Sequence, residues 1–139
     1  MMTFHQVAAK QFLDARARAP RQHMFTPITP AELRDMIAVH FVRAFLDETG
    51  RTGFLLNFDG YLQSVFNYGA PGAGAKAVEE AIRQGAVSLD CFAPYLPAYY
   101  ARFGFLKIGR APFDPKQAPP GWRVAEHGRP DVVFMRRRK

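Results

Sequence analysis

Gly69 to Gly74, with the sequence Gly-Ala-Pro-Gly-Ala-Gly, is the segment whose residue types and spacing most clearly indicate chemistry. It separates an expected strand from a helix expected over Ala75 to Gln84. In such a loop several backbone N–H groups point outward, the helix dipole favours negative charge, and glycine lets a phosphate approach closely. The Lys-Ser/Thr ending of a P-loop is missing. The loop predicts an anion site, with a simple turn as the alternative.

Two adjacent tyrosines, Tyr99 and Tyr100, could each supply a proton. A phenol with a pKa of about 10 is protonated at neutral pH. On a helix, neighbouring side chains point about 100° apart, so only one of the two can face a given cleft. The alternative for either residue is a half-buried aromatic side chain with its hydroxyl in water.

Asp90 and Cys91 are the other reactive side chains of interest, and both fall on an expected strand. Asp90 could act as a base or pair with Arg102 or Arg110. Cys91 is more typical of a small core residue. No group of His, Cys and Asp has the spacing of metal ligands, so no metal site is predicted.

The N-terminal forty residues are expected to be helical. Apolar residues at helical spacing predict a helix from Phe4 to Ala15, which Pro20 closes. Thr29 and Glu32 form a capping box, with Pro30 at the first helical position, and predict the start of a second helix.

Strands and helices alternate in the rest of the chain. Three strands joined by tight turns predict an antiparallel meander, and the later elements predict a βαβ crossover. This order is typical of an α/β fold of mixed (α+β) character, with a mixed sheet and helices on both faces. The expected strands are Phe41 to Leu46, Gly53 to Phe58, Tyr61 to Asn67, Val87 to Phe92, Phe105 to Arg110 and Asp131 to Arg136, and the later helices are Ala75 to Gln84 and Pro94 to Phe103.

The segment Tyr100-Ala101-Arg102-Phe103-Gly104-Phe105, together with the glycine-rich loop before it, resembles the GNAT superfamily of acyl-CoA-dependent N-acyltransferases. The matching stretch runs from about Phe41 to Arg110, and the final strand fits as well. In that family the loop after the fourth strand binds the pyrophosphate of acetyl-CoA, and the Tyr of Tyr-x-x-x-Gly-Phe often protonates the departing thiolate. The resemblance implies a GNAT-like enzyme that moves an acetyl group from acetyl-CoA to an amine of a protein or small molecule.

The resemblance also implies roles for individual residues. Tyr100 would be the general acid, because its spacing to Gly104 and Phe105 matches the family motif. Acyl transfer needs a donor to the developing oxyanion, and a backbone N–H in the range Val65 to Asn67 would supply it where the fourth strand splays from the fifth in the family fold. The implied cofactor-binding residues are Val65, Phe66, Asn67, Gly69, Gly72, Ala73, Gly74 and Ala75.

Two positions depart from the family pattern. Gly69 stands where the family usually has Arg or Gln, and Ala93 stands where it often has Asn. Both changes remove cofactor contacts. An alternative is therefore a catalytically reduced GNAT-like interaction module, of phage or mobile-element type, that binds a host protein.

The composition bears on partners and location. The formal charge of +7 suits a polyanionic cofactor, whereas nucleic acid is a less favoured partner because no interleaved aromatic and basic motif is visible. No apolar run is long enough for a transmembrane helix or a signal peptide, so no membrane partner is expected. The lone Cys91 fits a reducing compartment. We therefore expect a cytoplasmic protein, and the sequence leaves its oligomeric state open.

The 139 residues are predicted to form one domain, because a chain that is 48% apolar and 14% aromatic is not of the disordered class. Its predicted parts are N-terminal helices over 1–40, an acyl-CoA-binding core over 41–110, a proline-rich loop over 111–130 and a final strand over 131–136. The loop carries Phe113 and Trp122. It either forms a wall of an acceptor pocket or covers a sheet edge.

Overall fold

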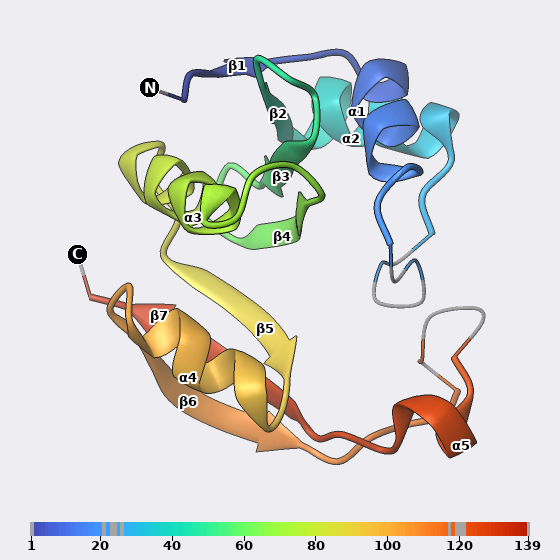
Figure 1. The fold of residues 1–139 in the computed structure, drawn as a ribbon, viewed down its shortest axis with the longest axis vertical. Helices are drawn as coiled ribbons and strands as arrows, with labels where there is room; N and C mark the ends of the chain where they lie inside the picture. The colour runs from blue at the N-terminus through green and yellow to red at the C-terminus, as the bar shows by residue number, and fades with distance from the viewer. Residues whose placement is uncertain are drawn as a thin grey trace.

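The computed structural model describes residues 2–20, 22, 25, 27–116, 118 and 122–138. Over these residues two sheets follow one another along the long axis of the molecule, each with helices packed against it (Figure 1). The elements in chain order are β1 (Phe4–Gln6), α1 (Ala9–Arg16), α2 (Pro30–His40), β2 (Arg43–Asp47), β3 (Thr52–Leu56), β4 (Leu62–Asn67), α3 (Ala73–Arg83), β5 (Ser88–Phe92), α4 (Tyr95–Ala101), β6 (Phe105–Ala111), α5 (Val124–His127) and β7 (Val132–Arg137).

The first sheet has the strand order β1-β2-β3-β4, with every pairing antiparallel. Every residue of β3 is buried, as expected for a central apolar strand that is covered on both faces. The turn from β2 to β3 is closed by the buried carboxylate of Asp47, which accepts hydrogen bonds from the Thr49 hydroxyl and the amides of Arg51 and Thr52. The predicted meander is confirmed.

The predicted first helix is wrong at its N-terminal end. Phe4–Gln6 forms β1, which pairs with the edge of β2, and α1 begins at Ala9. The Phe4 ring lies 5.8 Å from the Phe54 ring in the core. Strand pairing and this burial therefore override the helical spacing of Phe4 and Val7. From Ala9 onward the prediction is right, and Phe12 is fully buried.

The second helix is confirmed together with its cap. The Thr29 hydroxyl accepts from the Glu32 amide at 3.1 Å, and the Glu32 carboxylate accepts from the Thr29 amide at 2.9 Å. Phe41, predicted to begin a strand, instead ends α2 in the left-handed conformation with a φ of 54°. The strand that follows begins at Arg43.

The second sheet has the order β5-β7-β6, with β7 antiparallel to both neighbours. A single parallel bridge, from Tyr61 to Ser88, joins it to the first sheet. The parallel part of the predicted mixed sheet is thus reduced to one β-bridge. The predicted loop over 111–130 contains the end of β6 and the short α5, while residues 117 and 119–121 of that loop lie outside the described residues.

Helices cover both faces, which confirms the predicted α/β class. One core lies under α3 and α4 and contains Phe54, Leu89 and Phe105. A second core lies under α1 and α2 and contains Phe12 and Leu33. Because α3 and α4 pack on the same core, the loop that starts α3 lies close to Tyr99 of α4.

Candidate functional site

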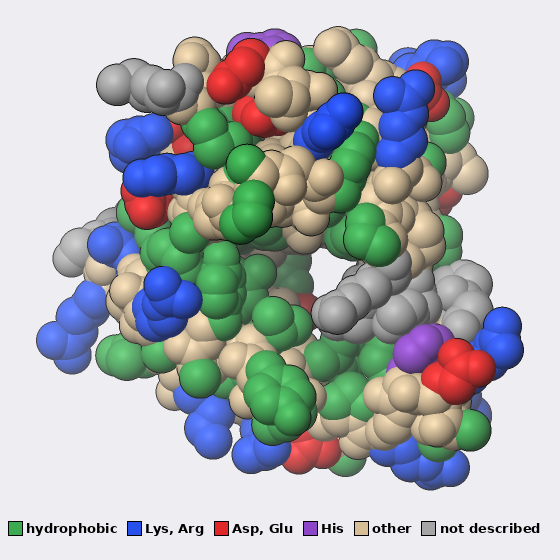
Figure 2. All heavy atoms as spheres, in the orientation of Figure 1, with side chains coloured by type: hydrophobic (Ala, Val, Ile, Leu, Met, Phe, Trp, Pro, Cys, Tyr) green, Lys and Arg blue, Asp and Glu red, His purple; other side chains and the backbone are tan. Residues whose placement is uncertain are grey.

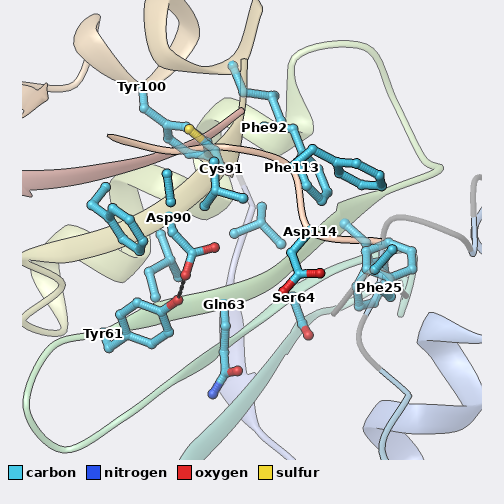
Figure 3. A pocket seen from close by; sticks show the side chains of 18 of the residues that line it. Phe25, Tyr61, Gln63, Ser64, Asp90, Cys91, Phe92, Tyr100, Phe113 and Asp114 are labelled. Carbon is cyan, nitrogen blue, oxygen red and sulfur yellow. Dashed lines mark hydrogen bonds between the residues drawn. The ribbon is translucent and has the colours of Figure 1, made fainter. Parts of the chain in front are cut away.

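A cleft of about 810 Å³ lies where β4 and β5 diverge. The two strands meet at the Tyr61–Ser88 bridge and separate beyond it, so backbone and side chains of both strands face open space (Figure 3). The space-filling view shows the molecule hollowed between its two halves (Figure 2). The described lining residues from these strands and α4 are Tyr61, Leu62, Gln63, Ser64, Val65, Phe66, Asn67, Asp90, Cys91, Phe92, Leu96 and Tyr100.

The edge of β4 that faces β5 carries a backbone donor. Tyr68 donates its amide to the Arg51 carbonyl at 2.9 Å, toward the β2–β3 turn. Amides of successive strand residues point to opposite sides, so the Asn67 amide points into the cleft and the Phe66 amide points toward β3. Val65 and Ser64 lie together opposite Phe54 in a β-bulge, and Ser64 has a φ of 54°. Of the predicted range Val65 to Asn67, Asn67 is the residue whose amide is clearly aimed at the cleft.

The Asn67 side chain also holds the glycine-rich loop in place. Its Oδ1 accepts from the Thr52 hydroxyl at 2.8 Å and from the Gly69 amide at 2.9 Å, and its Nδ2 donates to the Ala70 carbonyl at 3.1 Å. The Ala73 amide donates to the same carbonyl at 3.1 Å. The amides of Gly69 and Ala73, two of the predicted cofactor residues, therefore form hydrogen bonds within the loop and are not available to a ligand.

The remaining amides of the loop are unengaged. Within the part of the chain that the structure describes, the amides of Gly72, Gly74 and Ala75 have no hydrogen-bond partner. Gly72 has a φ of 84° and a ψ of −9°, and no atom lies within 4 Å of the position that a Cβ would take. The first turn of the 11-residue α3 contains no acidic residue. Free amides, a helix dipole and open space together could hold an anion.

The structure separates the two tyrosines as predicted. Tyr100 lines the cleft, and its hydroxyl makes no hydrogen bond among the described residues. No buried side-chain oxygen or nitrogen in the described chain lacks a partner, so the Tyr100 hydroxyl is open to the cleft. Burial of the ring raises the pKa of Tyr100 above its ordinary value, which keeps the proton on the oxygen.

Tyr99 points to the glycine-rich loop instead, a placement that sequence reasoning missed. Its hydroxyl lies 3.8 Å from the position of a Cβ on Gly74. The Arg102 guanidinium lies over the Tyr99 ring, 5.6 Å from its centroid. Burial raises the pKa of Tyr99, so this hydroxyl is also a donor at neutral pH. Adjacent residues on a helix point in directions about 100° apart, so the Tyr100 side chain faces the cleft and the Tyr99 side chain faces the glycine-rich loop.

Asp90 faces the cleft from the centre of β5. The sequence left a pairing with Arg102 or Arg110 open, and neither forms, because Arg110 bonds Asp131 at 2.6 Å and Arg102 lies over Tyr99. Its partner is Tyr61, which donates its hydroxyl to Asp90 Oδ2 across the two strands (Figure 3). Burial and this hydrogen bond raise the pKa of Tyr61. Tyr61 was expected only as the first residue of a strand, and nothing in the sequence links it to Asp90.

Cys91 turns to the opposite face of β5 and is buried in the core, where its Sγ lies 3.8 Å from Met135 Sδ. Burial, and secondarily the charge of Asp90, raises the pKa of the Cys91 thiol to about 11. A thiol of this kind is not a nucleophile at neutral pH. The structure thus supports the core interpretation of Cys91.

The segment after β6 forms the outer wall of the cleft. Phe113 and Asp114 line the cleft, and the ring of Trp122 packs between Phe113 at 5.6 Å and Phe92 at 5.0 Å. The Trp122 indole donates to the Gly128 carbonyl. Phe113 is therefore part of the wall, and Trp122 supports it from behind.

A third feature that the sequence did not indicate is a buried arginine behind the cleft. Arg16 of α1 donates to Ser64 Oγ at 2.9 Å and lies over the Phe25 ring. Burial lowers its pKa. It connects α1 to the β-bulge, and Ser64 and Phe25 both line the cleft.

Two features of the described residues bear on other kinds of site. Across 2–20, 27–116 and 122–138 and the isolated described positions, no three His, Cys, Asp or Glu side chains come together as metal ligands. None of the helices in these residues is both long and apolar enough to cross a membrane.

The sequence matches no protein-family model and no curated protein. Solved structures do resemble it. A phosphinothricin acetyltransferase from Sinorhizobium meliloti in complex with AcCoA is 16% identical, with 98% of this chain and 87% of that chain covered and a TM-score of 0.64. A GNAT family acetyltransferase from Elizabethkingia anophelis with acetyl-CoA bound is 13% identical, with 99% and 98% covered and a TM-score of 0.63.

A ribosomal-protein alanine N-acetyltransferase from Escherichia coli is 14% identical, with 97% of this chain and 92% of that chain covered and a TM-score of 0.63. At these identities the likeness establishes the fold. It agrees with the strand order, the splayed β4–β5 pair and the glycine-rich loop that opens α3. The chain therefore has the fold of the GNAT acetyltransferases.

Proposed function

We propose that this chain is an N-acetyltransferase that moves an acetyl group from acetyl-CoA to an amine. The observation that carries the proposal is the set of unengaged amides at Gly72, Gly74 and Ala75, beside a cleft that also holds Tyr100. The GNAT fold supports it, as do the two structural neighbours that contain acetyl-CoA.

The glycine-rich loop fits the diphosphate of coenzyme A. Three free amides and the dipole of α3 favour a dianion, and a hydrogen bond to a charged group contributes about 1.5–3 kcal/mol. The Tyr99 hydroxyl borders the loop at Gly74 and adds a fourth donor. In this proposal Gly69 and Ala73 shape the loop, while Gly72, Gly74 and Ala75 bind the cofactor.

The Asn67 amide serves as the donor to the oxyanion. It points into the cleft from the edge of β4, and Val65 at the bulge is the second backbone group on that edge. Phe66 acts indirectly, because its ring is buried against Phe12 and fixes the strand. A well-aimed donor of this kind lowers the activation free energy by about 3 kcal/mol.

Tyr100 serves as the general acid. When bound, acetyl-CoA supplies the acetyl group as a thioester. As the bond from carbon to the amine nitrogen forms, the bond from carbon to sulfur breaks, and the sulfur needs a proton. The Tyr100 hydroxyl holds one at neutral pH and has no internal partner among the described residues. Burial disfavours the phenolate, so Tyr100 regains a proton that the amine loses.

Calorimetric titration with acetyl-CoA tests the cofactor site directly. We expect saturable binding that inorganic pyrophosphate competes with. An Ala75→Pro variant removes one free amide in the first turn, where proline is tolerated, and we expect at least tenfold weaker binding. The control is Lys10→Ala on exposed α1, which should bind acetyl-CoA like the natural sequence.

Release of free thiol from acetyl-CoA in the presence of an amine then tests the reaction. Absence of acetyl-CoA binding would overturn the proposal and favour the interaction module. In this proposal the acceptor amine belongs to a small molecule rather than to a protein. A cytoplasmic location stays a prediction.

A further inference from the structure

We propose that Asp90, held by Tyr61, binds the ammonium group of the acceptor, and that the acceptor is a small primary amine with an apolar body. This inference rests on the proposed acetyltransferase function and names the substrate class for the same cleft. It starts from a hydrogen-bonded pair that the cofactor site does not use.

Asp90 is placed to meet a ligand in the cleft. On β5 the buried Leu89 and Cys91 point toward α4, and Asp90 between them points to the other face, where it is exposed. Tyr61 donates to Oδ2, and Oδ1 has no partner among the described residues. The phenol fixes the carboxylate, so one oxygen is oriented and available for an N–H donor.

Asp90 and Tyr100 lie on opposite faces of β5. Tyr100 packs against Phe105 in the core under α4, whereas Asp90 points away from that core. Both nevertheless line the one cleft, which passes between the diverging strands. The ammonium group held at Asp90 must lose one proton to solvent before its nitrogen can attack. The neutral amine then approaches the cleft from the side opposite the proton donor.

The part of the β5–β7 sheet face next to Asp90 is apolar. Asp90 lies directly opposite Phe134 in the pairing of β5 with β7, so both side chains share one face of the sheet. Phe92 and Val132 are the next pair along and point to the same face, and all of them line the cleft. Phe134 is 40% exposed, although it is a large apolar side chain. An apolar body attached to the amine would cover it.

Charge and size agree with this ligand. Asp114 lines the cleft from the segment after β6, so a second carboxylate favours a cation there (Figure 3). A carboxylate aimed at an ammonium group makes a charge-assisted hydrogen bond, which is stronger than a neutral one. The 810 Å³ cleft is of the size that takes a small molecule.

The test is calorimetry on the full chain without acetyl-CoA, using three probes. Phenethylamine has the ammonium and the aromatic body, hydrocinnamate has the same body with a carboxylate, and methylamine has the ammonium alone. We expect phenethylamine to bind at least tenfold more tightly than either of the others. Asp90→Asn, which keeps the volume and removes the charge, should weaken phenethylamine binding at least tenfold.

The matched control is Asp14→Asn, which removes an exposed carboxylate from α1 and should leave phenethylamine binding unchanged. Equal binding of phenethylamine and hydrocinnamate, or equal binding by the Asp90→Asn variant and the natural sequence, would overturn the inference. Should Asp90→Asn fail to fold, Phe134→Ser replaces it. This variant should weaken phenethylamine and spare methylamine, and an unchanged ratio between them would count equally against the inference.

A separate titration with acetyl-CoA keeps the two proposals apart. If acetyl-CoA binds and the amines are not discriminated, the acceptor class is wrong and the cofactor proposal stands. If acetyl-CoA does not bind, the cofactor proposal fails whatever the amines do.

Discussion

A pair of glycine substitutions in one loop tests the geometry on which the anion site depends. Gly72 has a φ of 84°, whereas Gly74 lies inside the first turn of α3. An alanine in the left-handed region costs about 1–2 kcal/mol, offset in part by about 0.5 kcal/mol from the less flexible unfolded chain. No atom lies within 4 Å of a Cβ on Gly72, so no further clash adds to this. Gly72→Ala should therefore destabilise the protein by about 1 kcal/mol.

Gly74→Ala should have the opposite sign. Its Cβ would meet Asn67 Cβ at 3.7 Å and the Tyr99 hydroxyl at 3.8 Å, both ordinary contacts. Alanine in place of a helical glycine contributes about 0.5–1 kcal/mol. The two variants should thus differ by about 1.5–2 kcal/mol in the free energy of unfolding.

Urea unfolding followed by circular dichroism measures this difference, and in a thermal scan it should appear as about 5–8 °C between the two midpoints. Equal midpoints, or a more stable Gly72→Ala variant, would refute the left-handed conformation at Gly72 and with it the outward direction of the loop amides.

Four further predictions concern the cleft. Tyr100→Phe should lower kcat about 10²-fold in a thiol-release assay and leave the Kd of acetyl-CoA from calorimetry unchanged, because it removes one proton and no cofactor contact; a purely structural role would instead change the Kd or the Tm. Because the pKa values of Tyr61 and Tyr100 are raised, the folded chain keeps protons that the unfolded chain loses above pH 10. The free energy of unfolding should therefore fall above pH 10, by up to about 1.4 kcal/mol per pH unit for each tyrosine. Tyr61→Phe should reduce this dependence on pH in urea unfolding. Asn67→Ala removes the side-chain bonds that shape the loop and should cost about 2 kcal/mol in urea unfolding while weakening acetyl-CoA binding. Cys91 should react with iodoacetamide at pH 7 far more slowly than free cysteine, measured by mass spectrometry, and fast labelling would contradict its burial.

Elements that depend on residues close together in the sequence were predicted correctly. The Thr29 capping box, the glycine-rich loop and the amphipathic α3 were all predictable, because each depends on residues within one or two turns of one another. The helix predicted over Phe4 to Ala15 failed at its start for the opposite reason. Phe4 pairs with Asp47, and the spacing of residues close to Phe4 cannot indicate a strand partner that is so distant in the sequence.

The sequence by itself determined the class of the fold, the position of the glycine-rich loop and the tyrosine motif that follows it. The tertiary structure decided which tyrosine faces the cleft, which loop amides stay free, and that Tyr61 meets Asp90. Helix periodicity, caps and glycine turns are set by interactions between near neighbours. Pairings across 29 residues are set by strand register and by the angle at which β4 and β5 diverge, and these depend on how both cores pack.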